Sequence, residues 1–217
     1  MTTIHQTVAI GPLVLPGDLA LPGAAAGLVV FVHGSGSSHR SARNRAVSQA
    51  LQQRRIATLL FDLLTPQEAE QGHKVFDIDL LALRLLQAMD WLRGVAAVQG
   101  LPLGLFGAST GAAAALVASA QRPRDVTALV SRGGRPDLAG PALGDVRCPT
   151  LLIVGAADVE VLQLNMAAYA RLKCEKHLEI VPRASHLFAE AGAMESVVRL
   201  ARDWFANHFA APSARDG

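Results

Sequence analysis

The sequence has few of the residues that mark several large protein classes. Its two cysteines, Cys148 and Cys174, have neither metal-ligand spacing nor the number that a disulfide framework needs. It holds a single tyrosine, and no run of lysine and arginine is interleaved with aromatic residues, which excludes the usual nucleic-acid-binding patterns. No apolar stretch is long enough to span a membrane, and the N-terminus lacks the basic and apolar segments of a secretory signal. We therefore expect a cytoplasmic protein with two reduced, mostly buried thiols and no nucleic-acid or membrane partner.

The rest of the composition is that of a well-packed globular domain. Apolar residues make up 51% of the 217 residues and charged residues 18%, so the chain can bury a large core and is not disordered. The formal net charge is only +2. No repeat, linker or low-complexity segment divides the chain. We expect one domain over residues 1–217, ending in a disordered tail at 211–217.

Strand-like and helix-like segments alternate along the chain, which predicts an α/β domain with a mainly parallel, doubly wound sheet. The expected parallel strands are 27–32, 57–61, 103–106, 126–130, 150–154 and 178–181. Ser41 can cap a helix that runs through Gln53, and amphipathic patterns predict helices at 76–92 and 194–209. Within the N-terminal segment 1–22, two further strand candidates are broken by Gly11-Pro12 and Pro16-Gly17, which indicates a hairpin at a sheet edge.

The most informative motif is Gly107-Ala-Ser-Thr-Gly111, a Gly-x-Ser-x-Gly pentapeptide. An apolar strand-like segment precedes it, and an alanine-rich helical segment, 112–118, follows it. This context predicts a nucleophile elbow, a tight strand-to-helix turn that presents the serine hydroxyl at the end of the sheet. The two glycines remove side chains that would collide where strand and helix approach each other. Ser109 is therefore the candidate nucleophile.

An acid and a histidine follow Ser109 in the chain order that this type of sheet requires. In an open parallel sheet, ligands bind beyond the carboxyl ends of the strands. Asp158 comes shortly after the strand expected at 150–154, and His186 lies in the segment after the strand at 178–181. We expect Asp158 to orient His186, and His186 to act as the general base.

Both assignments have competitors. Glu160 and Asp137 are alternatives for the acid, and His177 and His208 are alternatives for the base. Asp158 has a structural interpretation as well, because aspartate is a favoured residue at the start of a helix.

The glycine-rich segment 33–38 follows the first parallel strand. It lacks the Gly-Lys-Ser/Thr ending of a phosphate-binding loop, so nucleotide binding is poorly supported. A loop at this place can instead supply a main-chain amide to an oxyanion hole, together with the amide of Thr110, the residue after the serine. Ser35 is the expected donor, and Gly36 is the alternative.

Five segments spread along the chain carry a wider similarity. They are Val-His-Gly-Ser-Gly-Ser-Ser at 32–38, Phe-Gly-Ala-Ser-Thr-Gly at 106–111, Val-Ser-Arg-Gly-Gly-Arg-Pro-Asp at 130–137, Leu-Leu-Ile-Val-Gly-Ala-Ala-Asp at 151–158 and Ala-Ser-His-Leu-Phe at 184–188. Through them nearly the whole chain resembles the α/β-hydrolase superfamily, and most of all its dienelactone hydrolase-related branch of small enzymes without a cap domain. The resemblance implies a sheet of about eight strands with helices on both faces, and no cofactor.

The sequence departs from that branch at one position. Dienelactone hydrolases proper use a cysteine nucleophile, whereas this chain has Ser109. The resemblance therefore implies general ester or thioester chemistry more than dienelactone hydrolysis. Only the 19 residues 131–149 separate two of the expected strands, too few for a helical cap domain. Residues 64–74 are the other candidate for a flap.

These patterns predict a serine hydrolase that cleaves a small ester, thioester or lactone, with no metal and no obligate protein partner. A non-catalytic ligand-binding or scaffold protein of the same fold is the alternative. Arg132 and Arg40 are candidate substrate-binding residues, because both follow expected strands and a guanidinium suits a carboxylate. The competing interpretation is that Arg40 only decorates a solvated helix and Arg132 pairs with Asp137 or holds loop carbonyls.

Overall fold

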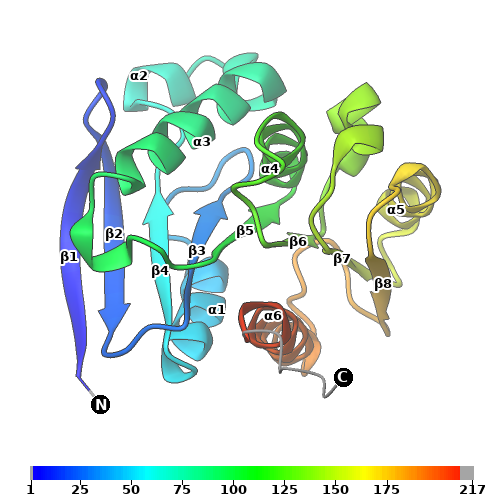
Figure 1. The fold of residues 1–217 in the computed structure, drawn as a ribbon. Helices are drawn as coiled ribbons and strands as arrows, with labels where there is room; N and C mark the ends of the chain where they lie inside the picture. The colour runs from blue at the N-terminus through cyan, green and yellow to red at the C-terminus, as the bar shows by residue number, and fades with distance from the viewer. Residues whose placement is uncertain (1, 211–217) are drawn as a thin grey trace.

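The computed structural model describes residues 2–210, which form an eight-stranded sheet with helices on both faces (Figure 1). The strands are β1 Thr3–Ile10, β2 Leu15–Pro22, β3 Gly27–Val32, β4 Ile56–Phe61, β5 Leu103–Ala108, β6 Ala128–Arg132, β7 Thr150–Gly155 and β8 Lys176–Val181. Their order in the sheet is β1-β2-β4-β3-β5-β6-β7-β8. The six strands from β3 to β8 run parallel, so their carboxyl ends meet at one edge. The mainly parallel sheet of about eight strands is confirmed.

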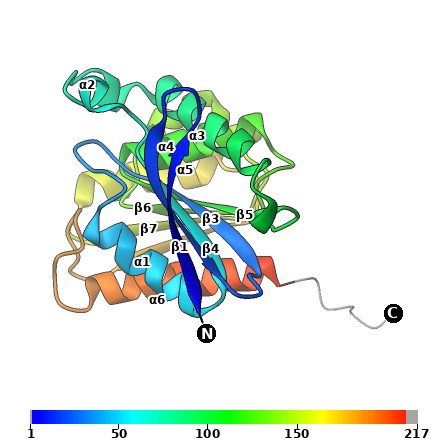
Figure 2. The ribbon, with the colours of Figure 1, turned by 90° about the vertical axis from the view of Figure 1, so that its left-hand side faces the viewer.

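Helices cover the sheet in two layers (Figure 2). The longer ones are α1 Ala42–Gln53, α3 Ile78–Leu92, α4 Thr110–Gln121, α5 Val159–Arg171 and α6 Ala193–Phe209. α1 and α6 lie side by side on one face, and α3, α4 and α5 lie on the other. Short segments complete the chain: α2 Pro66–Ala69 and the 3-10 turns η1 Lys74–Phe76, η2 Ala96–Val98 and η3 Pro136–Asp145. Within residues 2–210, every helix is too short or too polar to cross a membrane.

The apolar core has two parts, one on each face of the sheet. Leu59, Leu85 and Leu116 belong to the part under α3 and α4, and Phe31 and Phe205 belong to the part under α1 and α6. Every residue of β3, β4 and β7 is buried, as their continuous apolar sequences predict for strands covered on both faces. This rigid sheet holds the loops at its carboxyl edge in fixed positions.

The N-terminal hairpin is present at the sheet edge, but Pro16-Gly17 does not interrupt its second strand. β2 runs through both residues and pairs with β1 on one side and β4 on the other. A side chain at Gly17 would lie 2.8 Å from the carbonyl oxygen of Leu60, so glycine permits the close pairing with β4. Glycine here serves strand packing rather than a turn.

β6 was expected at 126–130 and instead ends two residues later, at Arg132. Ser131 and Arg132 continue the pairing, opposite Gly107 and Ala108 of β5. They are therefore fixed by the sheet and do not belong to the loop that follows. Between β6 and β7 the chain forms only η3, which packs against α4 and α5 and leaves no cap domain. The tail expected at 211–217 lies outside the described residues.

Candidate active site

Ser109 occupies the strained turn that the pentapeptide predicts. It joins β5 to α4 with φ of 51° and ψ of −123°, a backbone conformation that residues other than glycine rarely adopt. A side chain at Gly107 would lie 2.4 Å from the Cα atom of Ala112, and one at Gly111 would lie 2.1 Å from the carbonyl oxygen of Val32. Both glycines are thus required by the close approach of strand, helix and the end of β3. Ser109 is half-buried while Ala108 and Thr110 are buried, so the turn presents the serine.

Asp158 and His186 are brought together at the same edge of the sheet. The Nδ1 atom of His186 lies 2.7 Å from Oδ2 of Asp158, a short hydrogen bond in which the imidazole donates. Asp158 stands at the start of α5, yet its side chain makes no capping hydrogen bond there. The structural interpretation of Asp158 as a helix cap is therefore wrong. The histidine side chain is 39% exposed and the carboxylate 15% exposed, so the imidazole borders solvent and the acid lies behind it.

The competing acids and bases lie apart from the contact between Asp158 and His186. Asp137 accepts two hydrogen bonds from Arg135, at 2.8 and 2.9 Å, and Glu160 is exposed. His208 contacts the carbonyl oxygen of Trp204 and the carboxylate of Glu175 near the end of α6.

His177, the other competitor for the base, lies on β8 with its ring 5.5 Å from the ring of Trp204. Of the four competitors, none contacts the side chain of either Asp158 or His186 in the part of the chain that the structure describes.

The two cysteines are free, as expected. Burial raises the pKa of the Cys148 thiol to about 11, so this thiol stays protonated at neutral pH. It is not an activated nucleophile, and Ser109 keeps that assignment.

The turn after β6 links the serine and histidine loops. The Ser109 amide donates to the carbonyl oxygen of Arg132 at 3.4 Å, and the Ser109 carbonyl accepts from the amide of Arg135. Between these two bonds, Gly133 lies against the histidine loop, where an added side chain would be 3.2 Å from the carbonyl oxygen of His186. In residues 2–210, the His186 ring is hydrogen-bonded to Asp158 and not to the Ser109 hydroxyl.

The glycine-rich loop lies directly beside the serine. A side chain at Gly34 would lie 2.7 Å from Cβ and 3.4 Å from Oγ of Ser109, so only glycine fits this approach. The next amide, that of Ser35, donates a hydrogen bond of 3.1 Å to the Thr110 hydroxyl. The two expected oxyanion-hole residues are therefore adjacent, but the Ser35 amide has an internal acceptor.

His33 fixes this loop, a role that the sequence alone did not indicate. Its Nδ1 donates to the carbonyl oxygen of Gly34 at 3.0 Å, and its Nε2 accepts from the amide of Leu63 at 3.1 Å. Only the neutral ring with the proton on Nδ1 satisfies both bonds. Burial lowers the pKa of His33 accordingly. The feature of the sequence that could have identified His33 is its position immediately after the β3 strand and before Gly34.

Asp62, which follows β4, holds the other end of the loop. One carboxylate oxygen accepts from the amide of His39 at 2.6 Å, and the other lies 2.9 Å from Nδ1 of the same residue. Asp62 follows a parallel strand as Asp158 does, but the sequence alone did not indicate this role. Both ends of residues 33–39 are thus tied to the β4 edge.

The candidate substrate-binding arginines lie in different surroundings. Arg40 is exposed, and its Nε donates to Nε2 of His39 at 3.4 Å. Arg132 is only 6% exposed and reaches the first turn of α1, where its Nη2 lies 3.5 Å from Oδ1 of Asn44. Its Nε has no hydrogen-bond partner within residues 2–210. Burial, and to a smaller extent the charge of Arg43, lower the pKa of Arg132 to about 10, so it remains a cation at neutral pH.

Two cavities differ in how close they lie to the candidate site residues. One, of about 210 Å³, lies between residues 33–38 and the segment 64–75, and its apolar wall comes from Leu64, Pro66, Ala69, Val75 and Leu81. It reaches Gly34, which lies against Ser109, and Ser35.

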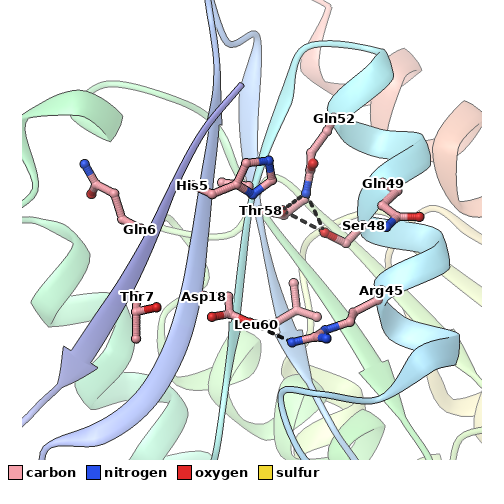
Figure 3. A pocket seen from close by; sticks show the side chains of 11 residues that line it. His5, Gln6, Thr7, Asp18, Arg45, Ser48, Gln49, Gln52, Thr58 and Leu60 are labelled. Atoms are coloured by element: carbon pink, nitrogen blue, oxygen red, sulfur yellow. Dashed lines mark hydrogen bonds and ion pairs between the residues drawn. The ribbon is translucent and has the colours of Figure 1, made fainter. Parts of the chain in front are cut away.

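A larger cavity, of about 360 Å³, lies between α1 and the β1–β2 hairpin (Figure 3). Its wall is held by internal bonds, from Gln52 to Ser48 and Thr58 and from Arg45 to Asp18. None of the predicted site residues lines it.

Comparison with known proteins identifies a near relative of almost the whole chain. No family model matches the sequence. The crystal structure of a dienelactone hydrolase from Anabaena variabilis is 52% identical, with a TM-score of 0.91 over 95% of this chain and 98% of that one. The esterase Est1E from Butyrivibrio proteoclasticus and a dienelactone hydrolase-like promiscuous phosphotriesterase from metagenomic libraries are 15% and 18% identical, with TM-scores of 0.78 and 0.74. They cover 95% and 97% of this chain, and 99% and 98% of their own, and share its fold.

Curated relatives come from two strains of Mycobacterium tuberculosis. Each is 53% identical over 205 residues and is provisionally named as a phosphoribosyl transferase. The match takes in 94% of this chain but 46% of each relative. The chain thus spans about half the length of the curated relatives it matches.

Proposed function

Because this chain belongs to the dienelactone hydrolase family of α/β-hydrolase-fold proteins, we propose that it is a serine hydrolase that cleaves a small ester, thioester or lactone through an acyl-enzyme on Ser109. The observation that carries the proposal is the 2.7 Å bond between His186 and Asp158, at the sheet edge where Ser109 occupies a strained turn. A partly buried aspartate that makes no capping hydrogen bond and instead accepts from a partly exposed imidazole is the arrangement that a general base requires.

In the proposed reaction, His186 acts first as base and then as acid. The Nδ1–H group of His186 donates a hydrogen bond to Asp158 and keeps its proton. The lone pair of Nε2 is therefore free to take the proton of the Ser109 hydroxyl. The serine oxygen then bonds to the substrate carbonyl, and the imidazolium returns the proton to the leaving alcohol, thiol or ring oxygen. In the second half of the reaction, His186 takes a proton from water, which attacks the acyl-enzyme. The proton then returns to the Ser109 oxygen, and the carboxylic acid is released. Asp158 stabilises the imidazolium throughout and stays ionised.

The oxyanion of each tetrahedral intermediate needs donors beside Ser109. The Thr110 amide opens α4 and is one of the first-turn amides that have no partner within the helix. The Ser35 amide lies on the opposite loop, next to Gly34. We place the oxyanion between these two loops, where the start of α4 also favours negative charge.

The apolar cavity beside residues 33–38 is the proposed place for the acyl group. Its volume of about 210 Å³ is below the roughly 300–1,000 Å³ of cavities that hold drug-sized ligands. Because only η3 stands between β6 and β7, the approach to Ser109 is not covered by a cap domain. Both features favour short or exposed esters over long acyl chains. Residues of the flap candidate 64–74, together with Val75, form one wall of this cavity, and its role as a flap stays a prediction.

For charged substrates, we propose Arg132 as the principal contact and Arg40 as an outer one. Neither guanidinium has a carboxylate within ion-pair distance in residues 2–210. Arg132 also lies 5.9 Å from the ring of Phe188, two residues after the base, which puts it under the histidine loop. An unpaired cation in this position favours an ester or lactone that carries an anionic group.

The names of the curated relatives refer to phosphoribosyl transfer. The part of those relatives that matches this chain does not favour that activity. The glycine-rich loop 33–38 carries no lysine, and its Ser35 amide is directed at Thr110. A non-catalytic protein of the same fold remains the alternative function. The intact Ser109, Asp158 and His186 set favours an enzyme over such a protein.

Labelling with a fluorophosphonate probe tests the proposal. The probe should modify wild-type protein at Ser109, and Ser109→Ala should abolish labelling and lower kcat on a responsive ester by on the order of 10⁶. Far-ultraviolet circular dichroism should show that the variant is folded. Ester hydrolysis by Ser109→Ala within about tenfold of wild type would refute the acyl-enzyme. A panel of esters, thioesters and lactones then separates the substrate classes.

A further inference from the structure

The hydrogen bond between the Ser35 amide and the Thr110 side chain occupies a donor that the proposed reaction needs. The amide nitrogen lies 3.1 Å from Thr110 Oγ1. An oxyanion that accepted directly from this amide would have to take the place of the threonine oxygen. The side chain of Thr110 must therefore either leave this position or take part in binding the oxyanion itself.

The surroundings of Thr110 favour participation. The residue is only 2% exposed and lies in the first turn of α4, immediately after the nucleophile. Its branched side chain has few rotamers in a helix. Rotation away from Ser35 would break a partly buried hydrogen bond and leave the amide unpaired, which is unfavourable.

The Thr110 hydroxyl can donate a hydrogen bond. A threonine hydroxyl donates one hydrogen bond and accepts up to two. Here Oγ1 accepts from Ser35, and within residues 2–210 its own proton has no acceptor. A hydroxyl that already accepts a hydrogen bond becomes a stronger donor, because hydrogen bonds in a chain polarise one another.

We propose that the Thr110 hydroxyl is a catalytic donor to the oxyanion, alongside the Thr110 amide, and that the Ser35 amide acts through it. The hydroxyl proton turns toward the substrate oxygen as negative charge develops there, while Oγ1 keeps its bond to Ser35. The oxyanion hole then has one threonine supplying two donors from neighbouring atoms. This inference rests on the proposed acyl-enzyme reaction and adds a residue to it.

Substitutions at Thr110 separate the two possibilities. Thr110→Val keeps the shape of the side chain, removes the hydroxyl and frees the Ser35 amide. If the hydroxyl is a donor, kcat should fall by about 10²-fold with KM nearly unchanged, since the contact forms in the transition state. The rate of fluorophosphonate labelling should fall in parallel, because the phosphoryl oxygen occupies the same hole. Thr110→Ser should restore most of the lost rate.

Thr110→Val activity equal to or above wild type would overturn the inference, because it would show that the hydroxyl only blocks the Ser35 amide. Equal losses in the valine and serine variants, together with lowered melting temperatures, would also overturn it in favour of a packing role. Ser109→Ala measured in the same series keeps the two proposals apart. If Ser109→Ala loses labelling while Thr110→Val does not change, the serine hydrolase stands and the hydroxyl donor falls.

Discussion

Asp158 combines two places that usually call for different side-chain behaviour. It is the N-cap residue of α5, where an aspartate oxygen normally accepts a hydrogen bond from a backbone amide. It also lies near the carboxyl end of β7. Its carboxylate instead reaches 28 residues along the chain to His186. Giving up a cap costs a helix about 1 kcal/mol, so the bond to the imidazole must offset that loss.

Asp158→Asn should therefore lower kcat by up to about 10⁴, because the amide favours the wrong tautomer of His186. Glu160→Gln is the matched control two residues away: the glutamate is exposed and should be replaceable with little effect. Steady-state kinetics on one ester measures both. If the glutamine variant lost activity and the asparagine variant kept it, the acid would have been assigned to the wrong residue.

His33 makes a second prediction at the scale of one residue. Its pKa is lowered, mainly by burial, so the folded protein resists protonation at this ring while the unfolded chain takes up a proton near pH 6.5. At high pH neither state binds this proton, so His33 does not make stability depend on pH there. As pH falls from about 6.5 to the lower pKa of the folded state, the free energy of unfolding decreases. The slope from one such group reaches at most about 1.4 kcal/mol per pH unit.

Denaturant unfolding of wild type and His33→Gln between pH 7.5 and 5 tests this. The glutamine variant should be less stable at pH 7.5, since it cannot make both ring bonds, and its stability should fall less steeply toward pH 5. Parallel curves for the two proteins would show that His33 titrates normally. Burial tends to raise the pKa of Glu68, but Thr65, Arg84 and Lys74 together lower it, so the stability that Glu68 contributes is present above about pH 4.5 and is lost in a separate window as pH falls below that value.

The single residues differ in how far sequence could identify them. Ser109, Asp158 and His186 were predicted because each follows a strand, and because chain order limits the choices. The structure brings the last two together, while the catalytic roles of all three remain predictions. The Ser35–Thr110 bond could not be predicted, since it joins residues 75 apart and depends on a side-chain rotamer.

At the scale of elements, close packing of the loops determines where the proposed catalytic residues lie. The turn after β7 packs on the histidine loop through Gly155, where a side chain would meet the carbonyl oxygen of Ala184 at 2.2 Å. The amides of Ala156 and Ala157 donate to Val181 and Ala184 across the same contact. The close packing and backbone hydrogen bonds between these two loops (the joint between the loops) thus hold Asp158 and His186 in place.

Gly155→Ala should shift the histidine loop, with a loss of about 1–3 kcal/mol in stability and a lower kcat. Gly144→Ala is the control, because an added side chain there meets nothing within 4 Å. Thermal unfolding and ester kinetics measure both variants. An alanine at 155 with wild-type melting temperature and activity would mean that the loops adjust without cost, and that the joint does not position the base.

Element boundaries were the part of the fold that sequence predicted least well. The helix expected at 76–92 begins at Ile78, because Asp77 caps it by accepting from the amide of Leu80. β6 extends to Arg132 because its backbone continues to pair with β5 and β7, and a serine and an arginine give no local sign of that pairing. Long apolar runs such as 27–32 were predicted without error, since burial on both faces leaves little alternative.

For the whole molecule, the sheet gathers segments that are far apart in sequence at one edge. The ends of β3, β4, β5, β6 and β7 and the loop after β8 all lie there, which is why the positions of the strands alone predicted that the candidate site residues would share this edge. Electrostatics at this edge could not be predicted in the same way. Arg135 is paired with Asp137, whereas Arg132 is buried and, within residues 2–210, has no carboxylate at ion-pair distance.

A buried arginine without an acidic partner weakens a fold, and replacing it by an apolar side chain of similar length is often neutral or stabilising. Arg132→Met should therefore keep or raise the melting temperature. It should also lower kcat/KM by about 10–100-fold on an ester that carries a carboxylate, from the loss of a charged hydrogen bond of roughly 1.5–3 kcal/mol, and change the neutral analogue much less. Arg40→Met, at an exposed position, should have a smaller effect on the same pair of esters. Equal losses on both esters with a lowered melting temperature would show that Arg132 supports Phe188 and the histidine loop, and does not select an anionic substrate.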